Sequence, residues 1–429
     1  MTIVNGAAQP DQEVKAATMD LLRQMMANAQ GGGHKQPRAE PVAPQAVRRI
    51  ETWSAASIET AKLPPREFLL GDAYCKRFLS SYLATGGTGK TSLVISQALA
   101  MASGRPLTGE HVYGRYNVVL VCFEDDADEL DRRVGAAMQH HKVKPEDIQE
   151  RFQLAVLKRE DGKLMVIDPE TRQPTLGPLA ASLEMLITEQ KIDVLILDPL
   201  KKIHGVEENS NDHMDAVAQV LTDMASKFNI AINTPHHTNK GAGDPGNADR
   251  GRGASAFKDA ARLGYTMTGM SVQDAAQFRV PEDERKWYSR VDSAKVNIVP
   301  PARGALWFRL VNVRLDNGDQ VQAIEPWSPP DLMAGMGKDT ATRILMEIRD
   351  GPGDGERYSN ATGAKERCVS RAFELHEPGK TASDARQIVK QWIKDGVVRV
   401  GDYYSPAKRK QQQGLFVSIA LTSSDEGEA

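Results

Sequence analysis

The sequence predicts an α/β fold with a mainly parallel β-sheet. Between residues 63 and 326, short apolar runs rich in β-branched residues alternate with longer amphipathic runs, which is typical of strands joined by crossover helices. The strand candidates are apolar nearly throughout, as expected when helices cover both faces of a sheet. They are 78–83, 117–123, 151–156, 194–198 and 230–234, and the expected helices are 91–102, 127–140, 177–190 and 213–228.

Composition excludes several classes of protein. The chain has 429 residues, too many for one ordinary domain, and a net charge of −3. A uniformly basic nucleic-acid binder is therefore excluded, and contact with DNA must use local basic patches. Three widely spaced cysteines fit a reducing cytoplasm better than a disulfide scaffold. No run of 18 apolar residues and no signal pattern occurs, so we expect a cytoplasmic protein without a membrane partner.

Linker-like stretches divide the chain into five expected parts. These are a flexible N-terminal arm and linker (1–50), the α/β domain (51–325), a second linker (326–337), a smaller domain (338–422) and an acidic tail (423–429). Residues 11–29 could form one short helix in the arm. The arm is then either a disordered tail or a segment that docks its Met/Leu face on a neighbouring subunit.

A glycine-rich turn follows the first strand and opens a helix, which is the context of a phosphate-binding P-loop. Backbone N–H groups of such a turn surround a polyphosphate, and the helix N-terminus adds its dipole. We expect Lys90 to contact the β- and γ-phosphates of ATP and Thr91 to ligate Mg²⁺. Ala84 departs from the pattern, because a glycine usually stands there. The predicted ATP-binding residues are Ala84, Thr85, Gly86, Gly87, Thr88, Gly89, Lys90, Thr91 and Ser92.

Two further strand candidates end in carboxylates. Asp198 closes the run 191–198 and is expected to hold Mg²⁺ beside the P-loop, directly or through water. Glu124 follows the run 117–123 and is expected to polarise the water that attacks ATP. The alternative for Glu124 is a helix N-terminal charge, a role that we assign to Asp125 and Asp126.

A third strand candidate ends at His236 and His237. A polar side chain at this tip can sense the γ-phosphate and pass its presence to the following loop. The alternatives are a structural histidine and a metal site, although His204 and His213 are poorly spaced to complete a metal site.

Together these segments resemble the RepA-type hexameric replicative helicases, a branch of the RecA/DnaB-like AAA ATPases. The resemblance covers about residues 64–310 and rests on ATGGTGKT, FEDDADELDRR, LILDPLKKIHGVEEN, HHTNKGAG, RGRGASAFKDAAR and AKVNIVP, in that order. It implies a RecA-like ATPase motor domain that uses ATP and Mg²⁺, a ring of identical subunits and translocation on DNA. By match, Lys90 and Thr91 take the Walker A roles, Glu124 is the catalytic base, Asp198 holds Mg²⁺ and His237 senses the γ-phosphate.

The resemblance also implies residues that act between subunits. Arg262 matches the arginine finger that enters a neighbour's site; the alternative is an ion pair within one subunit. Lys295 matches a second cation near the subunit boundary; the alternative is a solvated lysine. Two stretches match the loops that face DNA in the ring's centre, 205–213 and 239–253. The second supplies the cations Lys240, Arg250 and Arg252.

The C-terminal part lies outside this resemblance. It contains three helix-like segments and two strand-like segments, 397–400 and 415–419, an order that resembles a winged helix. Residues 381–410 hold seven Lys/Arg and three Asp/Glu, so this patch is basic. It either binds nucleic acid, with duplex DNA as one candidate, or docks a protein. The expected nucleic-acid contacts are Arg386, Lys390, Lys408, Arg409 and Lys410.

The sequence therefore predicts an ATP-dependent DNA helicase or translocase acting in replication, with ATP hydrolysed at the subunit interfaces of a hexamer. Two alternatives remain. One is a RecA/RadA-like recombination ATPase that forms filaments. The other is a DNA-bound regulatory ATPase that senses nucleotide without unwinding DNA.

Overall fold

The computed structural model describes residues 50–237, 257, 261–299 and 304–418. The chain divides into two compact units, 1–64 and 65–429. In the first unit the described residues 50–64 contain only the 3₁₀ turns η1 (Ala55–Ser57) and η2 (Thr60–Lys62). Trp53 there is 81% exposed. The expected arm and acidic tail lie outside the described residues, and the expected domain boundaries stay predictions.

A ten-stranded sheet organises the second unit. Its order is β14-β13-β12-β11-β3-β9-β8-β4-β5, with β10 also paired to β3. The segment from β11 to β5 is parallel, and β11, β12, β13 and β14 form an antiparallel extension. The strands are β3 (Leu79–Ala84), β4 (Val118–Cys122), β5 (Phe152–Val156), β8 (Val194–Asp198), β9 (Ala231–Asn233), β10 (His236–His237), β11 (Leu263–Gly269), β12 (Tyr288–Val296), β13 (Leu306–Arg314) and β14 (Gln320–Trp327).

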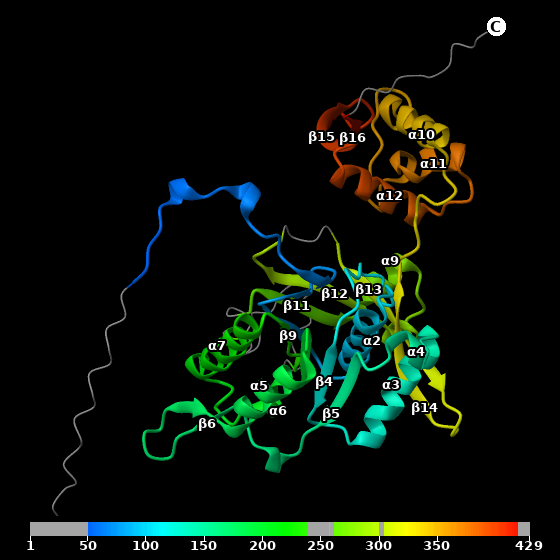
Figure 1. The fold of residues 1–429 in the computed structure, drawn as a ribbon. Helices are drawn as coiled ribbons and strands as arrows, with labels where there is room; N and C mark the ends of the chain where they lie inside the picture. The colour runs from blue at the N-terminus through cyan, green and yellow to red at the C-terminus, as the bar shows by residue number, and fades with distance from the viewer. Residues whose placement is uncertain (1–49, 238–256, 258–260, 300–303, 419–429) are drawn as a thin grey trace, which may run out of the picture. The chain divides into compact units, whose positions relative to one another are not determined.

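Helices cover both faces of this sheet (Figure 1). One face carries α2 (Lys90–Ser103), α3 (Ala127–His141) and α4 (Pro145–Ile148); the other carries α5 (Pro178–Gln190), α6 (Leu200–Ile203) and α7 (Asn211–Phe228). Alternate residues of β4 divide between the two cores: Leu120 packs with α2 and Val121 with the opposite helices. Successive side chains of each buried strand therefore point alternately into the two cores, one on each face of the sheet.

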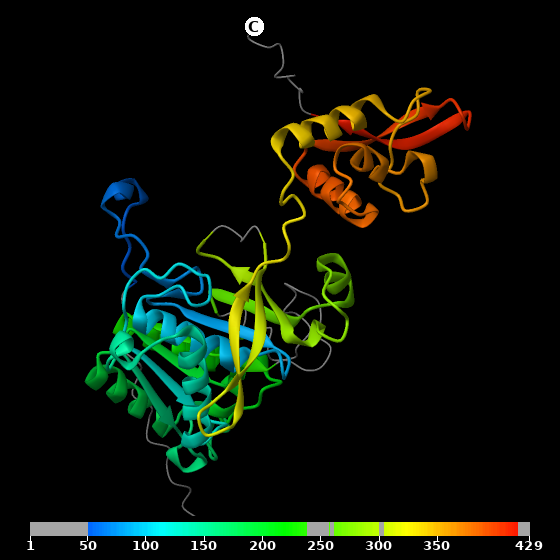
Figure 2. The same cartoon turned by 90° about the vertical axis from the view of Figure 1, so that its right-hand side faces the viewer.

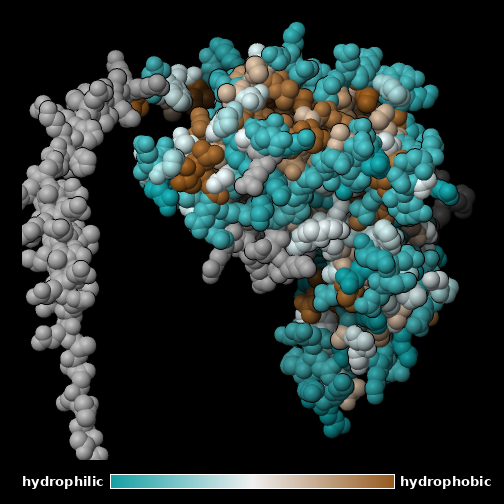
Figure 3. Space-filling view, turned by 90° about the horizontal axis from the view of Figure 1, so that it is seen from below, coloured by the Kyte–Doolittle hydropathy of each residue, from teal (hydrophilic) through white to brown (hydrophobic). Residues whose placement is uncertain are grey.

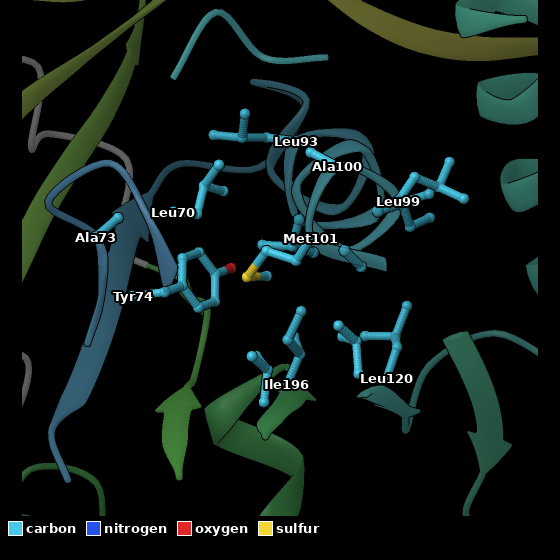
Figure 4. Close-up of a cluster of buried hydrophobic side chains, with 14 of the residues drawn as sticks. Leu70, Ala73, Tyr74, Leu93, Leu99, Ala100, Met101, Leu120 and Ile196 are labelled. Atoms are coloured by element: carbon cyan, nitrogen blue, oxygen red, sulfur yellow. The ribbon is translucent and has the colours of Figure 1, made fainter. Parts of the chain in front are cut away.

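Apolar side chains from distant segments meet around α2 (Figure 4). Leu93 and Met101 on this helix, Tyr74 from the short hairpin before β3, and Ile196 on β8 are all fully or almost fully buried. That hairpin consists of β1 (Phe68–Leu70) and β2 (Tyr74–Cys75). Burial of this kind contributes about 1.5–3 kcal/mol per large side chain, so the helix that opens at the P-loop is held firmly.

The predicted α/β class with a mainly parallel sheet is confirmed, and the predicted strands and helices are present within one or two residues at each end. Ser210 caps α7, because its hydroxyl accepts a hydrogen bond from the His213 N–H at 3.3 Å. The predicted end of the loop 205–213 is therefore wrong, because helix α7 already begins at Asn211.

Smaller elements fill the remaining connections. They are η3 (Arg159–Asp161), β6 (Met165–Ile167), β7 (Pro174–Leu176), α9 (Val272–Phe278) and η4 (Arg285–Trp287). No helix among the described residues combines the length and apolar character needed to cross a lipid bilayer. On the face drawn in Figure 3, hydrophobic residues appear in groups between hydrophilic ones.

The C-terminal residues form a separate core around α10 (Lys338–Asp350), α11 (Ser370–His376) and α12 (Ala382–Lys394), with η5 (Lys365–Arg367) before α11. A hairpin follows, made of β15 (Val398–Ser405) and β16 (Lys410–Val417). The expected order of three helices and two strands is confirmed, whereas the winged-helix class stays a prediction. The expected strand ends 397–400 and 415–419 are wrong: the strands are longer, and Lys410 begins β16 instead of lying in the loop.

Candidate functional site

The predicted P-loop joins β3 to α2. Gly87 and Gly89 adopt φ values of +81° and +86°, which favour glycine because a side chain would be strained there. Ala84 is the last residue of β3 and is buried. It tolerates a Cβ because it is still in strand conformation, which explains the departure from the usual pattern. The turn is closed by Thr88, whose hydroxyl donates to the Thr85 carbonyl at 3.0 Å.

The glycines of the loop have different surroundings. A Cβ added to Gly86 or Gly87 would meet no atom within 4 Å, whereas one on Gly89 would lie 2.3 Å from Leu310 Cδ2. One side of the loop is thus packed against β13, and the Gly86–Gly87 backbone faces open space. That open space is where a phosphate chain would lie against backbone N–H groups.

Lys90 supplies the positive charge of the site. Its side chain is buried, at 5% exposure, and its ammonium has no hydrogen-bond partner among the described residues. Burial lowers the pKa of Lys90, although the carboxylates of Asp198 and Glu124 oppose this shift. A buried ammonium without a partner is unfavourable. The residues present therefore fit a bound phosphate, which would satisfy this group.

Thr91 and Asp198 form the candidate magnesium site. The Thr91 hydroxyl donates to Asp198 Oδ2 at 2.9 Å. Burial raises the pKa of Asp198, while Lys90 and the Thr91 hydrogen bond oppose the increase. No three His, Cys, Asp or Glu side chains gather as a metal cage within the described ranges. The pair still fits Mg²⁺, because this ion commonly takes one carboxylate and completes its shell with phosphate oxygens and water.

Glu124 lies two residues beyond β4, beside the same site. Its Oε2 is 3.8 Å from His237 Nε2, and its side chain is 47% exposed. The neighbouring acids have other contacts: Asp125 pairs with Arg133 at 3.0 Å, and Asp126 caps α3 by accepting from the Glu129 N–H. Glu124 is therefore the carboxylate of this group that is positioned to act on a water.

His236 and His237 occupy different environments although they are adjacent. In β10, His237 pairs with Ala84 at the end of the P-loop strand. His236 is buried and stacks on Phe257 at 6.3 Å between ring centroids. Burial lowers the pKa of His236 to about 3 and also lowers that of His237. Both rings are thus neutral near pH 7, with His236 inside the core and His237 at the site.

The antiparallel extension supports the P-loop in a way that the sequence did not reveal. Ser289 on β12 is buried, and its hydroxyl donates to the Thr88 carbonyl at 2.8 Å. Ser92 on α2 donates to the Gln322 carbonyl of β14 at 3.4 Å, and Figure 2 shows β13 and β14 passing close to α2. These contacts join residues more than 200 positions apart, so no local pattern could indicate them.

A cleft shares Leu310 with the packing around Gly89 of this loop. Its walls include Trp287, Tyr288, Leu310 and Asn312. The pairing of β12 with β13 ends at Tyr288 and Arg309, so backbone groups of β13 beyond this point have no β12 partner within the described residues. An aromatic wall beside a strand edge that β12 no longer covers suits a planar heterocycle such as a nucleotide base.

Arg262 lies away from the P-loop of its own chain. It is exposed and immediately precedes β11, where Leu263 pairs with Ser80 and Met267 with Ala84. A strand rises about 3.3 Å per residue, so Arg262 lies roughly 16 Å below the level of Ala84. Lys295 is on the adjacent strand, opposite Gly264. The structure thus brings the two predicted interface cations together and separates them from the phosphate site.

The predicted nucleic-acid contacts fall in two regions. Arg386 and Lys390 lie on α12, while Lys408, Arg409 and Lys410 lie at the exposed tip of the C-terminal hairpin. The remaining predicted contacts lie outside the described residues, as does the whole of the predicted loop 239–253. They are Lys240, Arg250 and Arg252.

Comparison with known proteins agrees with this geometry. Residues 43–243 match a family model described as an AAA domain. The matched range contains the P-loop, Glu124 and Asp198 and is thus similar to the ATPase domains of this family. Among solved structures, the chain is similar to the flagellar accessory protein FlaH from Methanocaldococcus jannaschii, at 11% identity and a TM-score of 0.37, over 59% of this chain and 90% of that chain. The predicted RecA-like core is confirmed.

Proposed function

We propose that this protein is an ATP-driven DNA helicase or translocase whose RecA-like ATPase domains work as a ring. The observation that carries the proposal is the separation of Arg262 from the P-loop of its own chain. An ATPase site that needs an arginine in the transition state is completed here by a neighbouring subunit. The ordered segments that resemble hexameric replicative helicases support a hexamer that moves on DNA.

The site residues have separate roles in this proposal. Backbone N–H groups of residues 85–91 and the ammonium of Lys90 bind the phosphates of ATP, and the cleft beside Trp287 receives the base. Thr91 and Asp198 would hold Mg²⁺, which neutralises phosphate charge when bound. The P-loop is preorganised by Ser289 and Leu310, so little ordering is needed on binding.

Binding of ATP would change the contact between Glu124 and His237. Without nucleotide they lie 3.8 Å apart. A γ-phosphate offers His237 a stronger acceptor than the half-exposed Glu124, so its imidazole N–H turns toward the phosphate. Glu124 is then available to accept a proton from the attacking water. The following loop, which includes Lys240, Arg250 and Arg252, would carry this change to single-stranded DNA.

Strand displacement tests the proposal most directly. Forked DNA with a labelled strand is incubated with ATP and either wild-type protein or Glu124→Gln. We expect displacement by the wild type alone, and ATP binding by both proteins because Glu124→Gln keeps the phosphate contacts. DNA-stimulated ATP hydrolysis without displacement would favour a regulatory ATPase. Filaments instead of closed rings in electron micrographs would favour a recombination ATPase.

A further inference from the structure

The tip of the β15–β16 hairpin concentrates positive charge. The turn between the strands spans residues 406–409, and Lys408, Arg409 and Lys410 are all exposed. The hairpin holds four basic residues and one acidic residue, Asp402. None of the three tip cations forms an ion pair within the described part of the chain. Their charge is therefore available to a partner.

A buried carboxylate fixes this tip from outside the hairpin. Glu356, in the connection between α10 and α11, is 9% exposed. It accepts hydrogen bonds from the Tyr403 and Ser405 hydroxyls and from the Ala407 N–H at 3.2 Å. Arg367 Nε lies 3.4 Å from the same carboxylate. Hairpin tips are ordinarily mobile, so this anchoring presents the three cations in a defined arrangement.

Backbone contacts inside the turn complete the arrangement. The Arg409 N–H donates to the Ser405 carbonyl at 2.8 Å, and the Lys408 N–H donates to the Ser405 hydroxyl at 3.2 Å. Arg409 adopts φ of +52°, which is unusual for a residue with a side chain. The anchoring by Glu356 offsets this strain.

An exposed aromatic ring lies on the same hairpin, one strand residue before the turn. Tyr404 is 57% exposed and pairs across the hairpin with Gln411. It has no ring contact and no side-chain hydrogen bond within the described ranges. Tyr403, by contrast, donates to Glu356 and carries Arg367 over its ring. Tyr404 therefore projects from the face opposite Ser405 and Lys410, where its ring is an exposed stacking surface, with only Ser405 between it and the turn 406–409.

We propose that this hairpin tip binds single-stranded DNA, with phosphates on Lys408, Arg409 and Lys410 and an unpaired base stacked on Tyr404. Cations alone would suit a duplex equally well. The exposed ring favours single-stranded DNA over duplex DNA. Bases in a duplex are stacked on each other, whereas an unpaired base can stack on an aromatic side chain. The proposal rests on the proposed function for the identity of the nucleic acid, but it does not require ATP hydrolysis.

Cross-linking tests the contact on the full-length chain. An oligonucleotide carrying 5-iodouracil is bound without ATP and irradiated, and the linked residue is found by mass spectrometry. We expect a cross-link at Tyr404 in the wild type and in Lys90→Ala, since nucleotide is not needed. A cross-link confined to the ATPase domain, with none on the hairpin, would overturn the proposal.

A matched pair of variants measures the stacking. Tyr404→Phe keeps the ring and should bind single-stranded DNA as the wild type does. Tyr404→Ala should weaken binding by about 5- to 150-fold, the range for loss of one stacked base. It should leave basal ATPase activity unchanged. Equal affinity of both variants would contradict stacking of a base on Tyr404.

The cations are tested by salt dependence. Replacement of Lys408, Arg409 and Lys410 by Ala should reduce the slope of log affinity against log salt by about 2, at roughly 0.7 per lost phosphate contact. Glu356→Gln should give an intermediate loss of affinity, because it loosens the tip but keeps its charge. An unchanged slope in the triple variant would contradict the proposal. Failure of strand displacement with these effects intact would refute only the proposed motor function.

Discussion

Gly86 and Gly89 share one loop but have different structural roles. Gly89 needs both its positive φ and its missing Cβ, because Leu310 Cδ2 lies 2.3 Å from the position that a Cβ would occupy. Gly86 has no positive φ and no neighbour within 4 Å of that position. The backbone of Gly86 is therefore kept clear for a ligand, whereas Gly89 is required by the fold itself.

This difference predicts opposite effects on stability. Gly89→Ala should lower the free energy of unfolding by about 1–3 kcal/mol, from backbone strain and overpacking. Gly86→Ala should unfold like the wild type in urea, although its methyl group would obstruct a bound phosphate and weaken ATP binding. Equal unfolding midpoints for the two variants would contradict the role given to Leu310.

The buried His236 and the partly buried His141 predict how stability responds to acid. Burial lowers the pKa of His236 to about 3 and that of His141 to about 4, from an ordinary value of 6.5. Below pH 6.5 the unfolded chain therefore binds protons that the folded chain excludes, and stability falls as pH falls. Each histidine contributes up to about 1.4 kcal/mol per pH unit, until its folded pKa is reached.

Urea unfolding at pH 7.5, 6.5 and 5.5 measures this dependence. His141→Gln should show a shallower loss between pH 6.5 and 5.5 than the wild type, even if it is less stable at every pH. A slope identical to that of the wild type would show that His141 titrates normally in the folded state.

At the scale of elements, β12 acts as a support for the P-loop. Ser289→Ala removes the hydrogen bond to the Thr88 carbonyl and leaves this buried group unsatisfied, a loss of about 1 kcal/mol. We expect about a fivefold increase in KM for ATP, because the loop is less well ordered before binding. Ser293→Ala, on the same strand, is the control and should leave KM unchanged. Steady-state ATPase kinetics of the two variants test the expectation.

The parallel strands could be predicted from the sequence because each is a short apolar run, and their polar tips then had to meet at one edge of the sheet. Lys90, Glu124 and Asp198 were found in this way. The strands β12, β13 and β14 carry charged residues such as Arg309 and Glu325, so composition did not distinguish them from loops. Their contacts with the P-loop arise from pairing across the sheet, which no local pattern encodes.

The strands of the C-terminal hairpin are longer than the sequence predicted, for a related reason. Residues 411–413 are three glutamines, flanked by Gly414, and they resemble a loop in composition. In the structure Gly401 pairs with Gly414, which lets Arg357 lie against the hairpin. The strand continues because a side chain from elsewhere in the fold packs on it.

At the scale of the whole molecule, ATP hydrolysis should require two subunits, one that provides the P-loop and one that provides Arg262. Arg262→Ala should bind ATP but hydrolyse it poorly, and Lys90→Ala should not hydrolyse it at all. Mixing the two restores some sites, because an intact P-loop from the first variant can meet an intact arginine from the second. We expect ATPase activity to reappear on mixing, measured by phosphate release. Loss of activity in a strictly monomeric Arg262→Ala protein would instead show that the arginine acts within its own subunit.

The distance between Arg262 and its own P-loop also has a topological consequence. In a closed ring every chain gives an arginine to one neighbour and receives one from the other, so each P-loop is complete. If the ring opens to admit DNA, one P-loop at the break loses its arginine while the other sites stay whole. Opening of the ring would therefore stop ATP hydrolysis at one site only, the P-loop at the break.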